Sequence, residues 1–234
     1  MADLVLFGVS NMLGNVFDCA LMLGHRVRAV VRNQDEALRP RTRSAEERMA
    51  ALDPVPEYLT LDEFRPRAGE IHFLGTTSPA RAALVAELEQ RFALSLTTLV
   101  HPTAHVSPLA RLAGGVFVGA QAFVGPRVTI GAHAWVQTMT LVGHDSTIGP
   151  YALLRPACRI GGHCRIGEAA VIGMNAVVLE ELVVGARATV AAGAVVVQDV
   201  PEGVTVVGVP AWPLVRPAQP APAPSAADAK ENGS

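Results

Sequence analysis

Residues 142–173 read VGHDST-IGPYAL-LRPACR-IGGHCR-IGEAAV-IG when the sequence is written in blocks of six. Each block opens on an aliphatic residue, and the same spacing runs unbroken from Val106 to Val196, which gives sixteen consecutive aliphatic positions. Neither the 3.6-residue period of a helix nor the two-residue period of a strand produces a repeat of six. The period predicts a parallel β-helix built from hexapeptides, in which three repeats form one triangular coil of 18 residues.

Glycine recurs at a fixed place within the block. Nine of the sixteen aliphatic residues are followed directly by glycine, at positions Gly119, Gly125, Gly131, Gly143, Gly149, Gly161, Gly167, Gly173 and Gly185. Because glycine adopts backbone conformations that other residues resist, we expect glycine or another small residue to supply the tight turns of each coil. The aliphatic residues should point inward and stack, since a single hexapeptide cannot bury its own apolar side chain.

Residues 1–98 alternate strands and helices instead. Apolar runs predict strands, and apolar residues at helical spacing predict helices. The predicted strands are Leu4–Val9, Arg26–Val31, Glu70–Gly75 and Leu94–Val100; the predicted helices are residues 15–24 with a C-cap at Gly24, a short helix around Ala45–Leu52, and a helix that begins at Ser78 and Pro79. This order predicts a Rossmann-like α/β domain with a small parallel sheet.

The expected domain organisation follows from these two patterns. Residues 1–98 form the α/β domain and residues 99–216 form the β-helix. Residues 217–234 are rich in proline and alanine, and we expect a disordered tail without a function of its own.

The composition excludes several classes of protein. A formal net charge of −2 argues against a nucleic-acid-binding or membrane-surface protein. Lys230 is the only lysine, which argues against Schiff-base and phosphate-loop chemistry. The chain begins without a signal-peptide pattern and has no apolar run of about 18 residues, so we expect a cytoplasmic protein. Cys19, Cys158 and Cys164 are too few for a disulfide framework and are expected to be packing residues in a reducing compartment.

One turn position of the repeat carries reactive side chains. His144 and Asp145 stand where most other blocks have small or unreactive residues. A turn side chain points outward, and an imidazole beside a carboxylate is the minimal general-base unit. The residues alone also allow His144 to be a surface histidine without a role, because four more histidines lie in or beside the repeats, namely His101, His105, His133 and His163.

Three motifs, one of which contains His144 and Asp145, carry a resemblance to a known family. Residues 99–108 read LVHPTAHVSP, residues 142–149 read VGHDSTIG, and residues 206–214 read VVGVPAWPL. With the α/β domain before them, they resemble the sugar acyltransferases of left-handed β-helix fold. That family includes sialic acid O-acetyltransferases and the N-acetyltransferases of nucleotide-linked amino sugars. The resemblance covers residues 3–216.

The resemblance implies a reaction and the residues that perform it. His144 would be the general base and Asp145 the acid that orients it. The family works as a homotrimer with acetyl-CoA bound between adjacent β-helices, and Gly143, Gly162 and Ala192 match positions that meet this cosubstrate. No metal is implied, because a thioester is already activated and the enzyme must only join two substrates, remove a proton and stabilise an oxyanion. The residues that would bind the acceptor are Gly8, Ser10, Asn11, Arg32, Asn33, Gly75 and Thr76.

The sequence departs from the family at the acceptor end. The first loop of the family is usually Gly-x-Gly/Ser-Gly-His, whereas this chain has residues 8–14 as GVSNMLG, with Met12 in place of the histidine. Arg32 and Asn33 stand where relatives often have acidic residues, and Leu153 stands where relatives often have a second histidine. The identity of the acceptor and of the nucleotide therefore stays open.

The resemblance thus predicts an acetyl-CoA-dependent acetyltransferase that acts on an amino sugar, expected to be nucleotide-linked, in surface glycan synthesis. The alternatives are O-acetylation of a sugar such as sialic acid and a non-catalytic trimeric scaffold, for which the altered first loop is the support. A zinc-dependent carbonic anhydrase of the hexapeptide type would need a pair of histidines five residues apart, and positions 149 and 168 are Gly149 and Glu168 instead. The first loop also lacks the Gly-x-Gly-x-x-Gly spacing of a dinucleotide site.

Overall fold

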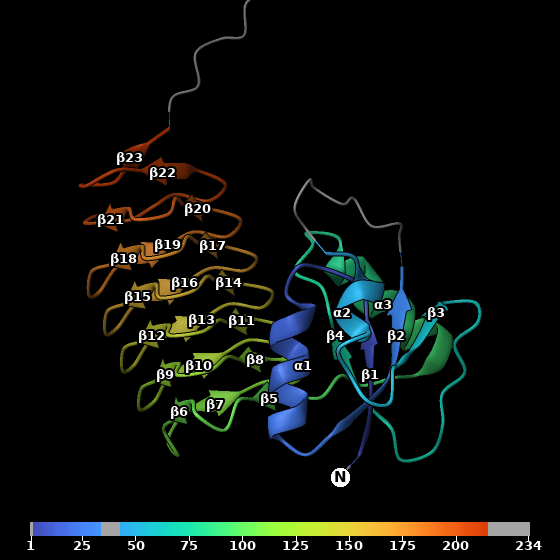
Figure 1. Ribbon diagram of the computed structural model, residues 1–234. Helices are drawn as coiled ribbons and strands as arrows, with labels where there is room; N and C mark the ends of the chain where they lie inside the picture. The colour runs from blue at the N-terminus through green and yellow to red at the C-terminus, as the bar shows by residue number, and fades with distance from the viewer. Residues whose placement is uncertain (1, 34–42, 215–234) are drawn as a thin grey trace, which may run out of the picture.

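A computed structural model describes residues 2–33 and 43–214, and Figure 1 shows a prism of stacked coils beside a smaller α/β unit. The predicted tail, residues 217–234, lies outside the described residues. No helix in the described part of the chain is long and apolar enough to cross a bilayer.

The smaller unit is a four-stranded parallel sheet in the order β3-β2-β1-β4. Its strands are β1 (Asp3–Phe7), β2 (Arg26–Arg32), β3 (Glu57–Thr60) and β4 (Ile71–Leu74), and its helices are α1 (Leu13–Met22), α2 (Ala45–Met49) and α3 (Arg81–Phe92). Strand β1 is buried on both faces: Leu4 and Leu6 pack with α1, and Val5 and Phe7 pack with α3. This explains why β1 is an apolar run and not an alternating pattern.

Two predictions for the first hundred residues are wrong. The third helix begins at Arg81 and not at Ser78, because the Ser78 hydroxyl accepts a hydrogen bond from the Ala80 amide in a turn that precedes the helix. The segment Leu94–Val100 is not a fourth strand of the sheet. Only Leu99–Val100 forms a strand, β5, and it pairs with the prism. Strand β3 takes the predicted place in the sheet, and its four residues, EYLT, are too few to show a period.

The prism has three parallel sheets, and nearly all of its strands are two residues long. The five-stranded sheet contains β7 (Arg111–Leu112), β10 (Thr129–Ile130), β13 (Thr147–Ile148), β16 (Arg165–Ile166) and β19 (Val183–Val184). The six-stranded sheet contains β6 (His105–Val106), β9 (Phe123–Val124), β12 (Leu141–Val142), β15 (Arg159–Ile160), β18 (Val177–Val178) and β21 (Val195–Val196). The eight-stranded sheet contains β5, β8 (Phe117–Val118), β11 (Trp135–Val136), β14 (Leu153–Leu154), β17 (Val171–Ile172), β20 (Thr189–Val190), β22 (Thr205–Val207) and β23 (Trp212–Pro213), of which β23 alone is antiparallel to its neighbour.

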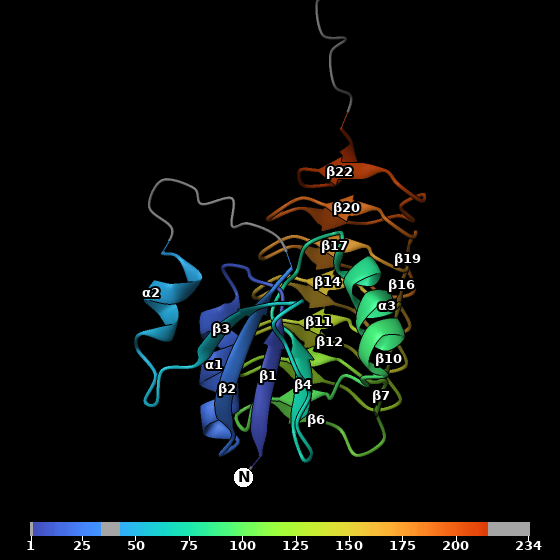
Figure 2. The same ribbon diagram turned by 90° about the vertical axis from the view of Figure 1, so that its right-hand side faces the viewer.

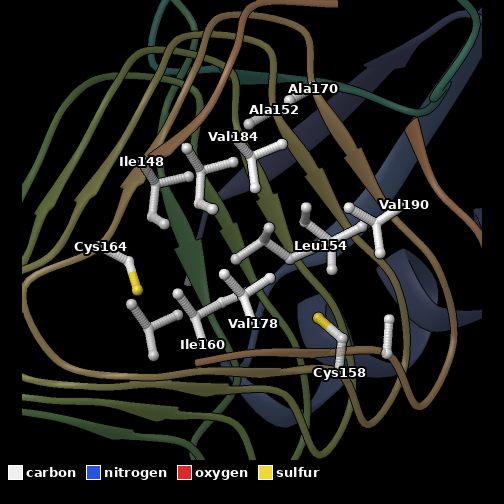
Figure 3. Packing of buried hydrophobic residues seen from close by; sticks show 14 of the residues in the cluster. Ile148, Ala152, Leu154, Cys158, Ile160, Cys164, Ala170, Val178, Val184 and Val190 are labelled. Atoms are coloured by element: carbon white, nitrogen blue, oxygen red, sulfur yellow. The ribbon is translucent and has the colours of Figure 1, made fainter. Parts of the chain in front are cut away.

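The register confirms the predicted period. Paired residues are 18 apart, as in Val142 with Ile160 and Ile160 with Val178, and every one of the sixteen aliphatic positions is the second residue of its strand. Figure 3 shows these side chains stacked inside the prism, with Cys158 and Cys164 in the same core. Burial raises the pKa of the Cys158 thiol to about 12, which fits a packing residue. The stacked sheets fit the left-handed β-helix that the resemblance implies.

The glycines do not supply the turns, which corrects the expectation from their spacing. The residues with positive φ in the coils stand two positions later and are mostly not glycine; Asp145 (φ 60°) and His163 (φ 58°) are examples. The repeat glycines allow close stacking instead: a Cβ on Gly143 would lie 2.6 Å from the carbonyl carbon of Gly161, and one on Gly167 would lie 2.4 Å from the amide nitrogen of Ala186.

The two units meet on the eight-stranded sheet. Helix α1 lies between the small sheet and this face of the prism (Figure 1). Phe73 of β4 reaches Phe117 and Trp135, with ring centroids 6.1 and 5.8 Å away. At the adjacent corner the Arg81 guanidinium donates to the carbonyl of Tyr151 and lies over its ring. Figure 2, seen from the side of the α/β unit, shows α3 close to the same corner.

We expect Ile160→Asp to unfold the prism. Ile160 is fully buried in the aliphatic column, and a carboxylate there would have no partner, at a cost of about 4 kcal/mol or more in the free energy of unfolding. Thermal unfolding followed by circular dichroism measures the effect. Arg159→Asp is the matched control, because Arg159 is exposed on the same strand. A stable, soluble Ile160→Asp variant would contradict the register.

Gly167→Ala should destabilise the stack by about 1–3 kcal/mol, because its Cβ would overlap the next coil. Gly114→Ala should be nearly neutral, since its Cβ would stand 3.4 Å from the Leu96 carbonyl oxygen. Chemical denaturation of both variants compares them directly, and equal stabilities would refute the idea that the repeat glycines are needed for close stacking.

Candidate active site

His144 and Asp145 form the turn between β12 and β13, at the corner where the six-stranded sheet meets the five-stranded sheet. The His144 side chain is 52% exposed, as a turn position predicts, whereas the Asp145 side chain is 18% exposed. The two side chains are in contact: Nδ1 of His144 lies 2.8 Å from Oδ2 of Asp145. The corner therefore presents an open imidazole backed by a more sheltered carboxylate.

Asp145 is held on its other side by Arg127 from the preceding coil. The Arg127 Nε donates to Oδ1 of Asp145, and Nη2 donates to Oδ2 at 2.7 Å. These bonds, followed by the bond to His144, hold the pKa of Asp145 well below its usual range. An ionised carboxylate only accepts hydrogen bonds, so Nδ1 of His144 is the donor. In the neutral imidazole this leaves the lone pair on Nε2, the ring nitrogen that lies next to Gly162 of the following coil.

His163 completes a cluster at this corner. Its ring meets the His144 ring edge-on with centroids 5.1 Å apart, and its Nε2 lies 4.0 Å from Oδ2 of Asp145. One ligand atom from each of His144, Asp145 and His163 falls within 4.8 Å of the others, a spacing from which a metal ion could be bound. The Arg127 guanidinium already occupies both oxygens of Asp145 and is the cation that this carboxylate meets.

The glycines assigned to the cosubstrate surround this imidazole. A Cβ on Gly162 would lie 2.8 Å from Cε1 of His144, so glycine at this position leaves room for the ring. Gly143 stacks on Gly161 in the same corner. Ala192 belongs to a different corner, between β20 and β21, where it packs over Gly173. One chain therefore brings Gly143 and Gly162 to His144 but keeps Ala192 apart.

A groove runs along the six-stranded sheet beside the His144 corner. It has a volume of about 510 Å³ and lies over β12, β15 and β18. Its lining includes Leu141, Arg159, Val177, Leu179 and Glu180. Sequence reasoning did not find this groove, although the residue just before each column aliphatic is the one that faces outward, and this residue is apolar at Leu141 and Val177.

The residues predicted for the acceptor do come together, at the carboxyl ends of the small sheet. Gly8, Ser10 and Asn11 follow β1, Arg32 ends β2 and Asn33 follows it, and Gly75 and Thr76 follow β4. The Ser10 hydroxyl donates to the Gly75 carbonyl at 2.8 Å. Gly8 has φ of +81° and its Cβ would lie 2.5 Å from Cγ2 of Thr76, so this close approach needs glycine. Ligands of open parallel sheets bind at this edge.

Charged groups frame this edge. Arg48 of α2 donates to the side-chain oxygen of Asn11 at 3.3 Å, and the Arg32 guanidinium lies 5.9 Å from the Tyr58 ring centre. A polar cavity of about 400 Å³ adjoins Arg32 and Asn33. Sequence reasoning missed Arg48 and Tyr58, because no spacing relates them to the loop.

Within one chain the residues predicted for the acceptor and the His144 corner lie on different sides of the prism. The α/β unit covers the eight-stranded sheet, and Arg81 ties it to the corner at Tyr151. His144 stands at the corner between the other two sheets, opposite the face of the prism that α1 covers. His133, on the Tyr151 corner, stacks on that ring, and burial, followed by the charge of Arg81, lowers its pKa.

Comparison with known proteins finds one matching family and a set of similar solved structures. The family described as bacterial transferase hexapeptide (six repeats) matches residues 163–198. Perosamine N-acetyltransferase from Caulobacter crescentus, solved with CoA and GDP-perosamine, matches at a TM-score of 0.79 and 28% identity, over 92% of this chain and 98% of that one. The acetyltransferase domain of PglB from Neisseria gonorrhoeae, solved with acetyl coenzyme A, matches at a TM-score of 0.76 and 28% identity, over 91% of this chain and 99% of that one. No curated protein sequence matches the chain.

The resemblance to hexapeptide-repeat sugar acetyltransferases is confirmed. WeeI from Acinetobacter baumannii shares the fold at a TM-score of 0.70 and 19% identity, over 92% of this chain and all of that one. These matches span the α/β unit and the prism together, so the likeness extends well beyond the repeat.

Proposed function

We propose that this protein transfers the acetyl group of acetyl-CoA to the amine of a nucleotide-linked amino sugar during glycan synthesis. The observation that carries the proposal is the His144–Asp145 pair at an open corner of the prism, in a chain that matches perosamine N-acetyltransferase over nearly its whole length. The sugar, its nucleotide and the choice of an amine over a hydroxyl belong to the proposal.

In this proposal each step of the transfer is carried out by a named group. The acceptor nitrogen attacks the thioester carbonyl carbon, and Nε2 of His144 removes a proton from that nitrogen. Asp145 accepts a hydrogen bond from Nδ1 throughout and so stabilises the imidazolium that forms. The carbon–sulfur bond then breaks, and the imidazolium returns its proton to the thiolate of CoA. A main-chain amide of the glycine-rich corner would stabilise the oxyanion.

We place acetyl-CoA along the groove of about 510 Å³ beside His144. Leu141, Val177 and Leu179 offer an apolar wall for the pantetheine arm, and Gly143 and Gly162 let the main chain pack closely around the imidazole at its end. This arrangement would bring the thioester to the corner that holds the base.

We assign the acceptor to residues 1–98 as a Rossmann-like domain and the transfer to residues 99–216. The predicted contacts are Gly8, Ser10, Asn11, Arg32, Asn33, Gly75 and Thr76, which share the carboxyl edge of the small sheet. Arg32 offers a positive charge where a nucleotide phosphate or sugar would lie.

We further propose a homotrimer, because one chain does not bring its acceptor edge to its own His144. A second copy would supply the missing half. It would also bring the turn that contains Ala192 in one copy close to the turn that contains Gly162 in another. Within one chain these two turns lie at different corners of the prism. Exposed apolar side chains on this part of the prism, among them Phe123, Met139 and Leu141, offer surface for the contact.

His144→Ala should lower turnover by roughly 10² or more and leave the melting temperature nearly unchanged, since an exposed turn side chain contributes little packing. Thiol release from acetyl-CoA, followed with a colorimetric reagent over a panel of nucleotide-linked amino sugars, measures both the reaction and the acceptor. A fully active variant would refute the mechanism. No release from the wild type, with no acetyl-CoA binding, would favour the scaffold.

Light scattering should give a mass close to three times 24.5 kDa. The physical reason is that the acceptor edge and the base can meet only across copies. A monodisperse monomer that still transfers acetyl groups would contradict this part of the proposal.

A further inference from the structure

Arg127, Asp145 and His163 occupy the same place on three successive coils. Each is the positive-φ residue of its turn, with φ of 56°, 60° and 58°, and the three positions are 18 residues apart. Their side chains therefore follow one another along the edge of the prism. The column places one positive charge, one carboxylate and one imidazole in line beside His144.

The contact between Arg127 and Asp145 is stronger than an ordinary surface pair. Nε and Nη2 of the guanidinium bind the two carboxylate oxygens separately, so the carboxylate cannot rotate about its own axis without losing a bond. Oδ2 accepts from Nη2 and from His144 Nδ1 at 2.7 and 2.8 Å. Oδ2 of Asp145, the oxygen that accepts a hydrogen bond from His144, is thus held in place by a residue of the preceding coil.

We propose that Arg127 is a positioning residue for the transfer reaction, which acts through Asp145: it fixes the carboxylate that aims the His144 imidazole, and its charge offsets the field of that carboxylate. This inference rests on the proposed function and adds a residue to its machinery. Asp145 alone would favour the imidazolium and would leave less of the free base. The guanidinium offsets that field while it holds the carboxylate in place.

Other charged groups at the corner are few in the described chain. His163 faces Asp145 at 4.0 Å, and Glu180 and Glu181 form the turn of the following coil. The main chain links these turns: the His163 amide donates to the His144 carbonyl, and the Glu181 amide donates to the Gly162 carbonyl. Arg127 is the cation that contacts Asp145 directly, so its removal changes the charge beside His144 most.

The test compares Arg127→Gln with Arg187→Gln. Arg187 is a matched control, because it too has positive φ in a turn and pairs with an acid one coil later, Glu202, at a different corner. We expect Arg127→Gln to lower kcat by about tenfold and to move the acidic limb of the kcat/KM profile up by about 0.5 pH unit or more. Arg187→Gln should leave both at the wild-type values.

A conservative variant separates the effect of the positive charge of Arg127 from the effect of its paired contact with Asp145. Arg127→Lys keeps the positive charge but not the paired contact, so it should retain the wild-type acidic limb and still lose kcat. Wild-type kcat and pH profile in Arg127→Gln would overturn the proposal. So would a raised KM for acetyl-CoA with unchanged kcat, because that result makes Arg127 a binding residue.

An NMR titration of the His144 ring in the free protein gives a readout that does not depend on turnover. Arg127→Gln should raise the pKa of this imidazole, and Arg187→Gln should not. If Arg127→Gln raises the His144 pKa but the wild-type protein transfers no acetyl group, the contact from Arg127 through Asp145 to His144 is supported and the proposed function is rejected. If the pKa is unchanged and the wild-type protein does transfer the acetyl group, only the role of Arg127 is rejected.

Discussion

The main-chain hydrogen bonds between successive coils are the interaction on which the rest of the structure depends. Two-residue strands have little stability of their own, and each strand binds its counterpart 18 residues away. The turns bond as well: the Asp145 amide donates to the Pro126 carbonyl and the His163 amide to the His144 carbonyl. This second set of bonds explains the positive φ of residues that are not glycine, because the left-handed conformation aims each amide at the coil before it.

Much of the prism could be predicted because its period is global. A stacked column needs an aliphatic residue at every sixth position, so the sequence from Val106 to Val196 records the fold directly. The role of the glycines could not be predicted in the same way. A spacing shows where small residues stand, but only the distance between coils, such as 2.6 Å from a Cβ on Gly143 to the Gly161 carbonyl carbon, shows why. The short strand at Leu99–Val100 was misassigned because the period was not extended one step before Val106.

The residues of the candidate site also differ in how far they could be predicted from the sequence. His144 and Asp145 could be recognised from their chemistry, since neighbours in sequence are neighbours in a turn. Arg127 was missed as a partner because its contact with Asp145 runs along the stacking axis. Once the register is known, subtracting 18 from Asp145 gives Arg127 and adding 18 gives His163. The contacts of Arg48 with Asn11 and of Arg32 with Tyr58 follow no such rule, because the α/β unit is not periodic.

A rigid stack suits a reaction that consists mainly of holding two substrates in place. His144 stands in a turn whose main chain is bonded to the coils on both sides, and its ring is backed by Asp145 and bounded by Gly162. The proposed base is therefore held in position before any substrate binds, so the proposed transfer would need little reorganisation. The α/β unit is also held against the prism, by Phe73 packing on Trp135 and by Arg81 bonding to Tyr151, but on the side opposite to His144. The proposed homotrimer would bring one copy's acceptor edge to another copy's His144. In that proposal, assembly and not a flexible hinge completes the site.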